Sequence, residues 1–193
     1  MHLRLATAAD AGAIAAIYAP IVASTAISFE EVAPGADEMR SRIETALRTY
    51  PWVVAEDDGQ VLGYAYGGTW RPRRAYRWTV EVTAYVHPSA HGRGVGRALY
   101  AALFRVLEAQ GFHRAVAGIA LPNDASIALH RAVGFEAVGV YREVGHKLGA
   151  WHDVAWFERP IGVPGAAADE PIPLADLPGA VLGAALAGQA EGP

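Results

Sequence analysis

The chain has 193 residues, of which 52% are hydrophobic, and this length and composition predict one compact domain with a sizeable core. It contains no cysteine, which excludes disulfides, thiolate metal sites and a cysteine nucleophile. The formal net charge is −4, so the basic excess typical of nucleic-acid-binding proteins is missing. No apolar run is long enough to span a bilayer, and the first residues lack the pattern of a secretory signal. We therefore expect a cytoplasmic protein with no nucleic-acid or membrane partner.

Hydrophobic residues follow the spacing of helices in some segments and the spacing of strands in others, and the two kinds of segment alternate along the sequence. In chain order they predict a strand at residues 2–6, a helix beginning at Thr7 and Asp10, a helix at 37–49, a hairpin of strands 52–56 and 61–67, a basic loop at 71–77, a strand at 78–86, a helix at 94–110, a strand at 115–120, a helix ending at Val133, and strands at 136–142 and 151–159. This order predicts an α/β fold in which a mixed twisted sheet carries helices on both faces.

Residues 163–193 differ in composition from the rest of the chain. They consist largely of Ala, Gly and Pro, and they hold four acidic residues and no basic one. Such a segment buries too little apolar surface to offset the entropy of ordering it. The sequence therefore predicts a single domain over residues 1–162, followed by a disordered acidic tail in which only 180–187 favour a weak helix.

The most informative segment joins the strand at 78–86 to the helix at 94–110. Glycine stands there at every second position, in His91-Gly92-Arg93-Gly94-Val95-Gly96-Arg97. Glycines let a ligand approach the backbone closely, and the first N–H groups of a helix lack partners and lie at the positive end of its dipole. The segment predicts a binding site for a phosphate or pyrophosphate, the alternative being a tight turn without a ligand.

Two familiar phosphate-binding loops do not match this segment. The Walker loop ends in Gly-Lys-Ser/Thr, whereas Gly96 is followed here by Arg97 and Ala98. The dinucleotide fingerprint Gly-x-Gly-x-x-Gly does not fit the spacing of Gly92, Gly94 and Gly96. Nucleotide hydrolysis and a Rossmann fold are therefore disfavoured.

The order of strand, glycine loop, helix and second strand–Asn–helix unit resembles the GNAT acyltransferase superfamily, with His91 where Gln or Arg is usual. Finer motifs are similar to the subgroup of phosphinothricin N-acetyltransferases and methionine sulfoximine/sulfone acetyltransferases. These motifs are Tyr76-Arg77-Trp78-Thr79-Val80-Glu81, Leu121-Pro122-Asn123-Asp124, Leu129-His130, Gly134-Phe135 and Lys147-Leu148-Gly149-Ala150-Trp151-His152-Asp153-Val154. The resemblance covers most of residues 1–160.

The resemblance implies transfer of an acetyl group from acetyl-CoA to a primary amine, by direct attack in a ternary complex. An ammonium group cannot attack, so a base must first remove a proton. The resemblance assigns this role to Glu81, a carboxylate inside a hydrophobic strand, where desolvation raises its pKa. The alternative is a structural carboxylate held in an ion pair.

The resemblance also implies which residues bind acetyl-CoA. The strand separates from its neighbour after the catalytic carboxylate, so the backbone of Ala84, Tyr85 and Val86 would pair with the pantetheine arm, and the N–H near Val86 would polarise the thioester carbonyl. Asn123 would contact the pantetheine from the next strand end. The residues assigned to the pyrophosphate are Gly92, Arg93, Gly94, Val95, Gly96 and Arg97.

His130 occupies a position where many members of the superfamily carry a tyrosine that protonates the departing thiolate. An imidazole is able to do the same near neutral pH. Two alternatives remain open, namely a histidine packed on a helix face and one that contacts CoA without transferring a proton.

The densest basic cluster lies between two predicted strands, and one of its arginines would bind the carboxylate of a small anionic substrate. Arg74 is assigned this role, with Tyr76 beside it, although a solvated loop is the alternative. Phe29 and Glu30 are candidate pocket walls, together with Trp70. No metal is expected, because the adjacent side chains of His152 and Asp153 point to opposite faces of a strand.

The sequence therefore predicts an N-acetyltransferase that acts on phosphinothricin, methionine sulfoximine, methionine sulfone or a similar small amine. Alternatives are acetylation of another small amine or of a protein N-terminus, and a non-catalytic acyl-CoA-binding module. Members of the subgroup are commonly homodimers, so we expect a homodimer here as well.

Overall fold

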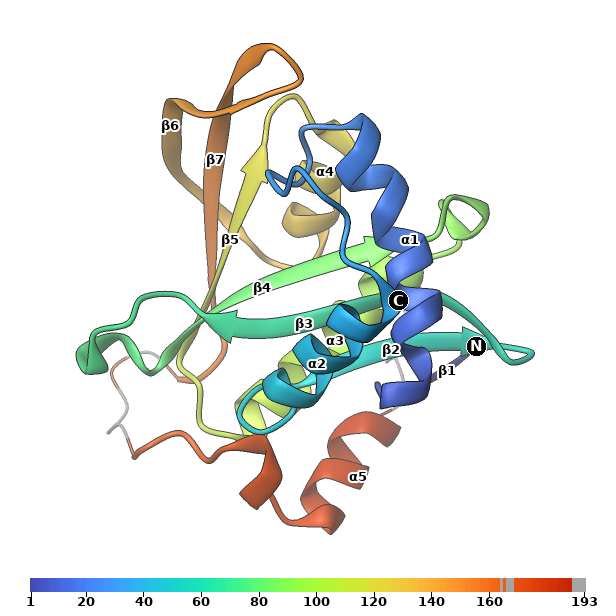
Figure 1. Cartoon of the computed structure of the whole chain (residues 1–193). Coiled ribbons are helices and arrows are strands. Elements are labelled where there is room, and N and C mark those ends of the chain that lie inside the picture. Colours follow the sequence, from blue (N-terminus) through green and yellow to red (C-terminus); the bar gives the residue numbers. More distant parts are fainter. Residues whose placement is uncertain (164, 166–168, 189–193) are drawn as a thin grey trace.

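The computed structural model describes residues 1–163, 165 and 169–188, and it contains one seven-stranded mixed sheet (Figure 1). The strand order is β1-β2-β3-β4-β5-β7-β6, in which only β4 and β5 run parallel. The strands are β1 (His2–Leu5), β2 (Trp52–Asp57), β3 (Gln60–Thr69), β4 (Thr79–Val86), β5 (Arg114–Ala120), β6 (Glu136–Lys147) and β7 (Ala150–Pro160). The helices are α1 (Ala11–Ser24), α2 (Ala36–Ala46), α3 (Val95–Ala109), α4 (Asp124–Ala132) and α5 (Gly179–Ala187).

Helices cover both faces of the sheet, as the sequence predicts. α1 and α2 pack on one face, where Ile14 and Ile43 meet Tyr64 of β3. α3 packs on the opposite face (Figure 1). Leu99 and Leu103 of this helix meet alternate residues of the central strands there. The sheet therefore separates two hydrophobic cores, and successive side chains of β4 enter one or the other. In the part of the chain that the structure describes, no helix has both the length and the apolar character needed to cross a membrane.

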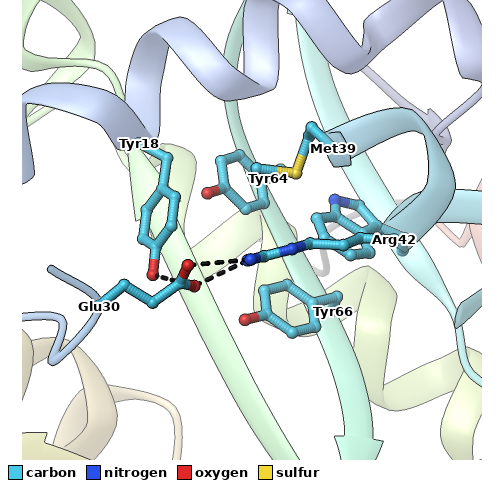
Figure 2. A pocket seen from close by; sticks show the side chains of 7 residues that line it. Tyr18, Glu30, Met39, Arg42, Tyr64 and Tyr66 are labelled. Carbon is cyan, nitrogen blue, oxygen red and sulfur yellow. Dashed lines mark hydrogen bonds and ion pairs between the residues drawn. The ribbon is translucent and has the colours of Figure 1, made fainter. Parts of the chain in front are cut away.

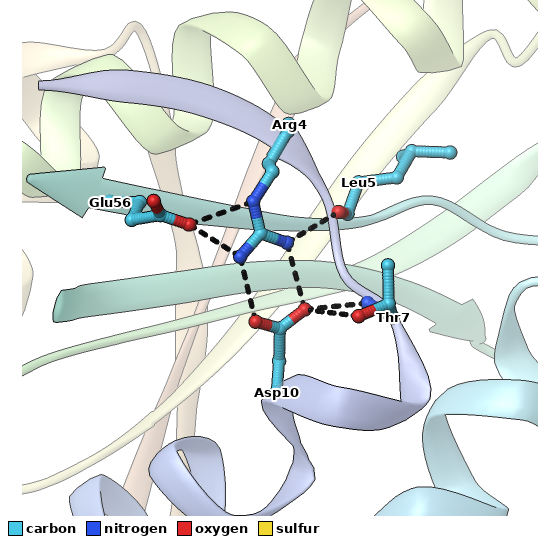
Figure 3. Close-up of polar contacts among 5 residues, drawn as sticks. All are labelled: Arg4, Leu5, Thr7, Asp10 and Glu56. Atoms are coloured by element: carbon cyan, nitrogen blue, oxygen red, sulfur yellow. Dashed lines mark hydrogen bonds and ion pairs between the residues drawn. The ribbon is translucent and has the colours of Figure 1, made fainter. Parts of the chain in front are cut away.

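Arg4 joins β1, β2 and the start of α1 (Figure 3). Its guanidinium donates to both carboxylate oxygens of Asp10, at 2.7 and 2.8 Å, and to Glu56 at 2.6 and 2.9 Å. The backbone N–H and the hydroxyl of Thr7 also donate to Asp10. The bond from Arg4 is the main cause that lowers the pKa of the Asp10 carboxyl, and burial opposes it. This network fixes the direction in which α1 leaves the sheet.

The segment after β7 differs from the disordered tail that composition predicts. Leu174, Leu177 and Ala185 are buried with Val106 of α3, and α5 packs against that helix. The prediction from composition is wrong here because a few apolar side chains of the segment are enough to pack against α3. Backbone hydrogen bonds to Gln110 and Thr49 also hold the segment against the core. The ordered structure therefore extends beyond residue 162, and the expected weak helix is α5. Residues 164, 166–168 and 189–193 of the predicted tail lie outside the described residues.

Candidate active site

β4 and β5 separate in the middle of the sheet. Their parallel pairing ends at Glu81 and Val116. β4 remains paired to β3 as far as Val86, and β5 remains paired to β7 from Arg114 to Ala120, but the two strands no longer pair with each other. The edge of β4 that faces β5 is therefore free of strand pairing from Val82 to Val86, which confirms the predicted separation after Glu81. An extended ligand can add to such an edge through main-chain hydrogen bonds.

The glycine loop lies directly after this free edge and opens into α3. Gly92 and Gly94 have φ of +75° and +78°, a conformation that glycine adopts readily. A Cβ atom at either position would meet nothing within 4 Å, so both face open space. The first helical bond runs from Ala98 N–H to Gly94 O at 3.1 Å, so the N–H groups of the three preceding residues have no helical partner.

Two side chains hold the glycine loop in place. Nε2 of His91 donates to the carbonyl of Val86 at 3.0 Å, which ties the loop to the end of β4. Arg93 pairs with Asp57 at 3.1 Å, on the hairpin of β2 and β3. The loop therefore presents free N–H groups at the positive end of α3, a geometry suited to a pyrophosphate.

Glu81 lies on β4 at the last position paired with β5. Its neighbours Val80 and Val82 enter the core beneath α3, so its side chain is on the face of α1 and α2. Glu81 is half-buried and makes no side-chain hydrogen bond among the described residues. Burial raises the pKa of its carboxyl above the usual range, and the charge of Arg71 opposes this shift. A half-buried, unpaired carboxylate at the opening of the sheet is suited to accept a proton.

The arginines of the loop between β3 and β4 fall into two groups. Arg74 and Arg77 both pair with Glu170, at 2.6 and 2.5 Å, and Arg77 also stacks on Trp78. Arg71 forms no ion pair within the described ranges, and its charge acts on Glu81. The structure thus pairs Arg74, the predicted carboxylate ligand, with the C-terminal segment. Arg71 follows Gly68 by three residues, and Gly68 stands directly opposite Glu81 in the pairing of β3 and β4, so Arg71 begins the loop close to Glu81. Tyr76 stays in this loop, where it packs edge-on against Trp70 at 5.1 Å.

A cavity of about 160 Å³ opens beneath α1 and α2, on the same face of the sheet as Glu81. Figure 2 shows the side chains that line it. Its centre is the ion pair of Glu30 and Arg42, at 2.7 Å, and Tyr18 donates to Glu30 at 2.9 Å. Tyr66, which lines the cavity, is paired with Thr83 of β4, two residues along the same strand face from Glu81, so the cavity lies near Glu81. The residues that line it are Tyr18, Glu30, Met39, Arg42, Trp52, Tyr64 and Tyr66.

The loop between α1 and α2 is fixed against the hairpin of β6 and β7. Phe29 packs directly over Gly145 and lies 6.2 Å from the ring of His152. The buried ammonium of Lys147 donates to the carbonyls of Val22 and Ser28, both at 2.7 Å. Of the two predicted pocket walls in this loop, Glu30 lines the cavity, whereas Phe29 anchors the loop beside it.

His130 is 6% exposed and both of its ring nitrogens have partners inside the protein. Nδ1 lies 2.7 Å from the carbonyl oxygen of Ser126, and Nε2 lies 2.9 Å from the hydroxyl of Tyr100. Burial lowers the pKa of His130. These contacts favour the alternative of a histidine packed on a helix face over a general acid. Asn123 likewise has a structural contact, because its Oδ1 caps α4 by accepting from the N–H of Ser126 at 3.1 Å.

Comparisons with known proteins agree with this geometry. Residues 3–156 match the family model of the GNAT acetyltransferase domain. A phosphinothricin N-acetyltransferase of Streptomyces viridochromogenes is 42% identical over 85% of this chain and 90% of that one. A methionine sulfoximine/methionine sulfone acetyltransferase of Pseudomonas aeruginosa is 40% identical over 81% of this chain and 92% of that one.

The architecture also matches solved structures. The crystal structure of a GNAT superfamily phosphinothricin acetyltransferase from Sinorhizobium meliloti, in complex with acetyl-CoA, superposes with a TM-score of 0.83 at 41% sequence identity. The match covers 88% of this chain and 94% of that one. The fold and the family that the sequence motifs predict are thus confirmed, and the chain belongs to the GNAT family of acetyltransferases.

Proposed function

We propose that the protein transfers the acetyl group of acetyl-CoA to the amino group of a small amino-acid-like substrate. Phosphinothricin, methionine sulfoximine and methionine sulfone are the candidates, because relatives at 40–42% identity carry these substrates in their names. The observation that carries the proposal is the position of Glu81, at the point where β4 leaves β5 and just before the free edge that leads to the glycine loop.

In this proposal the chain binds acetyl-CoA mainly through its backbone. The free edge of β4, at Ala84, Tyr85 and Val86, pairs with the amide groups of the pantetheine arm. The N–H groups at the start of α3 bind the pyrophosphate. The amide nitrogen of Asn123, whose oxygen is used as a helix cap, remains available to the pantetheine. The residues proposed for the pyrophosphate are Gly92, Arg93, Gly94, Val95, Gly96 and Arg97.

Glu81 removes a proton from the ammonium group of the substrate, because its raised pKa makes it a stronger base than an ordinary carboxylate. The amine then attacks the acetyl carbonyl directly, and the N–H near Val86 stabilises the negative charge that develops on the oxygen. Collapse of the tetrahedral intermediate breaks the C–S bond and releases CoA as the thiolate, which takes up the further proton that the nitrogen loses as the amide forms. Arg71 is the arginine best positioned to bind the substrate carboxylate near Glu81. The α1–α2 loop and the cavity at Glu30 and Arg42 form the border of the proposed site, on the face of the sheet that α1 and α2 cover.

The test is a thiol-release assay with acetyl-CoA and a panel of amines. The panel holds phosphinothricin, methionine sulfoximine, methionine sulfone, ordinary amino acids, polyamines and an N-terminal peptide. We expect turnover of one of the first three with kcat/KM of about 10⁴ M⁻¹s⁻¹ or more. A preference for polyamines or for the peptide would contradict the substrate class while leaving acetyl transfer in place.

We also propose that the protein is a homodimer that pairs through the hairpin of β6 and β7. β6 is the edge strand of the sheet, and long exposed edges are commonly covered by another chain. Six large apolar side chains are exposed on this hairpin, namely Val138, Val140, Tyr141, Val144, Leu148 and Trp151. Light scattering should give a dimer, and Val140→Lys should give a monomer. A monomeric parent protein would refute this part of the proposal.

A further inference from the structure

The C-terminal segment reaches across the molecule to the arginine loop between β3 and β4. Both carboxylate oxygens of Glu170 are used, since Arg77 donates to them through Nε at 2.5 Å and through Nη2 at 2.6 Å. Arg74 donates to the same carboxylate at 2.6 Å. The indole N–H of Trp78 donates to the carbonyl of Asp169, also at 2.6 Å. Three side chains of one loop are therefore held by two consecutive residues of the segment.

The segment is itself fixed to the core directly after Glu170. The side-chain amide of Gln110, which is 1% exposed, donates to the carbonyls of Ile172 and Thr49, both at 2.8 Å. The N–H of Ile172 donates back to the carbonyl of Gln110 at 2.8 Å, and that of Leu174 donates to Thr49 at 3.1 Å. Glu170 thus lies two residues before Ile172, whose backbone is bound to the buried Gln110, and this contact limits how far the carboxylate of Glu170 is able to move.

The ion pairs of Glu170 with Arg74 and Arg77 form what we call the Glu170 clasp, and they divide the arginines of the loop into two groups. Arg74 and Arg77 are paired with Glu170, whereas Arg71 has no ion pair in the described part of the chain. Arg71 lies three residues after Gly68, which is directly opposite Glu81 in the register of β3 and β4, and its charge lowers the pKa of Glu81. The loop has no buried core of its own: its 3₁₀ turn at Arg74–Tyr76 contains no buried residue, and the packing of Tyr76 on Trp70 lies at the surface. Its conformation therefore depends on what holds it from outside. Glu170 also lies beyond residue 156, where the match to the family model ends.

We propose that Glu170 is a positioning residue for substrate recognition: by clasping Arg74 and Arg77 it holds the β3–β4 loop in the conformation that presents Arg71 to an anionic amino-acid-like substrate. The inference rests on the proposed function for the identity of the substrate. Glu170 touches neither substrate nor acetyl-CoA in this scheme, so it affects substrate affinity and leaves the chemical step unchanged.

The experiment compares Glu170→Gln and Glu170→Asp with the parent protein at low ionic strength. Asp37→Asn is the matched control, because it breaks an exposed ion pair with Arg40 on α2, away from the loop. For Glu170→Gln we expect the KM of the amine to rise about two- to fivefold, in line with the modest strength of exposed ion pairs. We expect kcat and the KM of acetyl-CoA to stay within measurement error. Glu170→Asp, which keeps the charge, should lie closer to the parent protein, and 1 M salt should reduce the difference.

A second readout does not depend on the substrate. Trypsin cleaves after arginine, so cleavage after Arg73, Arg74 or Arg77, followed by mass spectrometry, reports how often the loop opens. We expect faster cleavage there in Glu170→Gln and no change in Asp37→Asn. Unchanged cleavage together with an unchanged KM would overturn the inference, and so would a lowered KM, because Glu170 would then compete with the substrate.

The two readouts also separate this inference from the proposed function. If the protein acetylates none of the amino-acid-like amines but loop cleavage still rises in Glu170→Gln, the substrate class is wrong and the clasp stands as a loop-positioning contact. If turnover occurs as proposed and Glu170→Gln changes neither readout, the clasp is refuted and the proposed function is untouched.

Discussion

The hydroxyl of Tyr100 lies 2.9 Å from Nε2 of His130, on the buried side of α4. Nδ1 of the same ring lies 2.7 Å from the carbonyl of Ser126, and a carbonyl only accepts, so Nδ1 carries the proton. Burial lowers the pKa of His130, which favours the neutral ring, and in a neutral ring with its proton on Nδ1 the Nε2 atom accepts the hydrogen bond of Tyr100. In this arrangement His130 has no proton aimed at the opening between β4 and β5.

Tyr100→Phe tests this assignment. The variant leaves Nε2 of His130 buried without a donor, which should lower the free energy of unfolding by about 1–3 kcal/mol. We expect kcat to stay within twofold of the parent value, because the ring takes no part in the chemistry. Denaturant unfolding and steady-state kinetics measure the two effects. A large loss of kcat with unchanged stability would instead support His130 as the general acid.

Glu81→Gln tests the proposed base. The amide has the same shape but is unable to take a proton from the ammonium group, so kcat/KM should fall by about 10²- to 10⁴-fold. Binding of acetyl-CoA, measured by calorimetry, should be unchanged, because its proposed contacts lie on the β4 edge and the glycine loop. Glu44→Gln, which alters an exposed carboxylate of α2, is the control and should keep full activity. Full activity in Glu81→Gln would remove Glu81 from the role of base.

The raised pKa of Glu81 also predicts the pH dependence of both activity and stability. The acidic side of the pH–rate profile should lie above the usual range of a glutamic acid, because the base must be ionised to act. A carboxyl whose pKa is raised by folding contributes most to stability at low pH, and this contribution is lost as the pH rises through the folded-state pKa. Glu81→Gln should therefore raise the melting temperature at neutral pH and have little effect at low pH. Melting curves from pH 4 to 8 for both proteins measure the difference.

The glycine loop makes a separate prediction about acetyl-CoA. Gly94→Ala places a Cβ on a residue with φ of +78°, which costs about 1–2 kcal/mol and disturbs the N–H groups at the start of α3. Gly149→Ala introduces the same strain at φ of +77° in the turn between β6 and β7, where a Cβ also meets nothing within 4 Å. Both variants should lose similar stability, but only Gly94→Ala should raise the KM of acetyl-CoA. An equal KM in the two variants would argue against pyrophosphate binding at this loop.

The elements around the candidate site that the sequence predicts correctly are local in the chain. The strand of Glu81, the glycine loop and α3 follow one another directly, so hydrophobic periodicity and glycine spacing reveal them together. The predicted element order also matches the observed sheet, although β6 runs to Lys147 and is longer than expected. The separation of β4 from β5 was implied by the family resemblance, not by any pattern within the strand.

The parts that sequence reasoning missed depend on contacts between distant segments. Nothing in the local sequence of Arg74 indicates that Glu170 pairs with it, and the few large apolar side chains of the C-terminal segment give no sign that it packs against α3. The cavity likewise joins Tyr18, Glu30 and Arg42 from α1, α2 and the loop between them. The composition of a segment indicates how much apolar surface that segment buries by itself. The contacts described here form only when the folded sheet brings distant segments together, so composition does not reveal them.

The last prediction concerns which arginine recognises the substrate. Arg71→Gln should raise the KM of a carboxylate-bearing amine by about 10-fold or more, the loss expected for a hydrogen bond to a charged group. Arg74→Gln should have a smaller effect on this KM, because Arg74 is paired with Glu170.

Arg71→Gln has a second expected result, in the pH dependence of the rate. Since Arg71 opposes the rise in the pKa of Glu81, its removal should move the acidic side of the pH–rate profile to higher pH. Arg74→Gln should leave that profile in place. If the KM rises only in Arg74→Gln and the profile does not shift in Arg71→Gln, Arg74 binds the substrate carboxylate, as the sequence alone predicts.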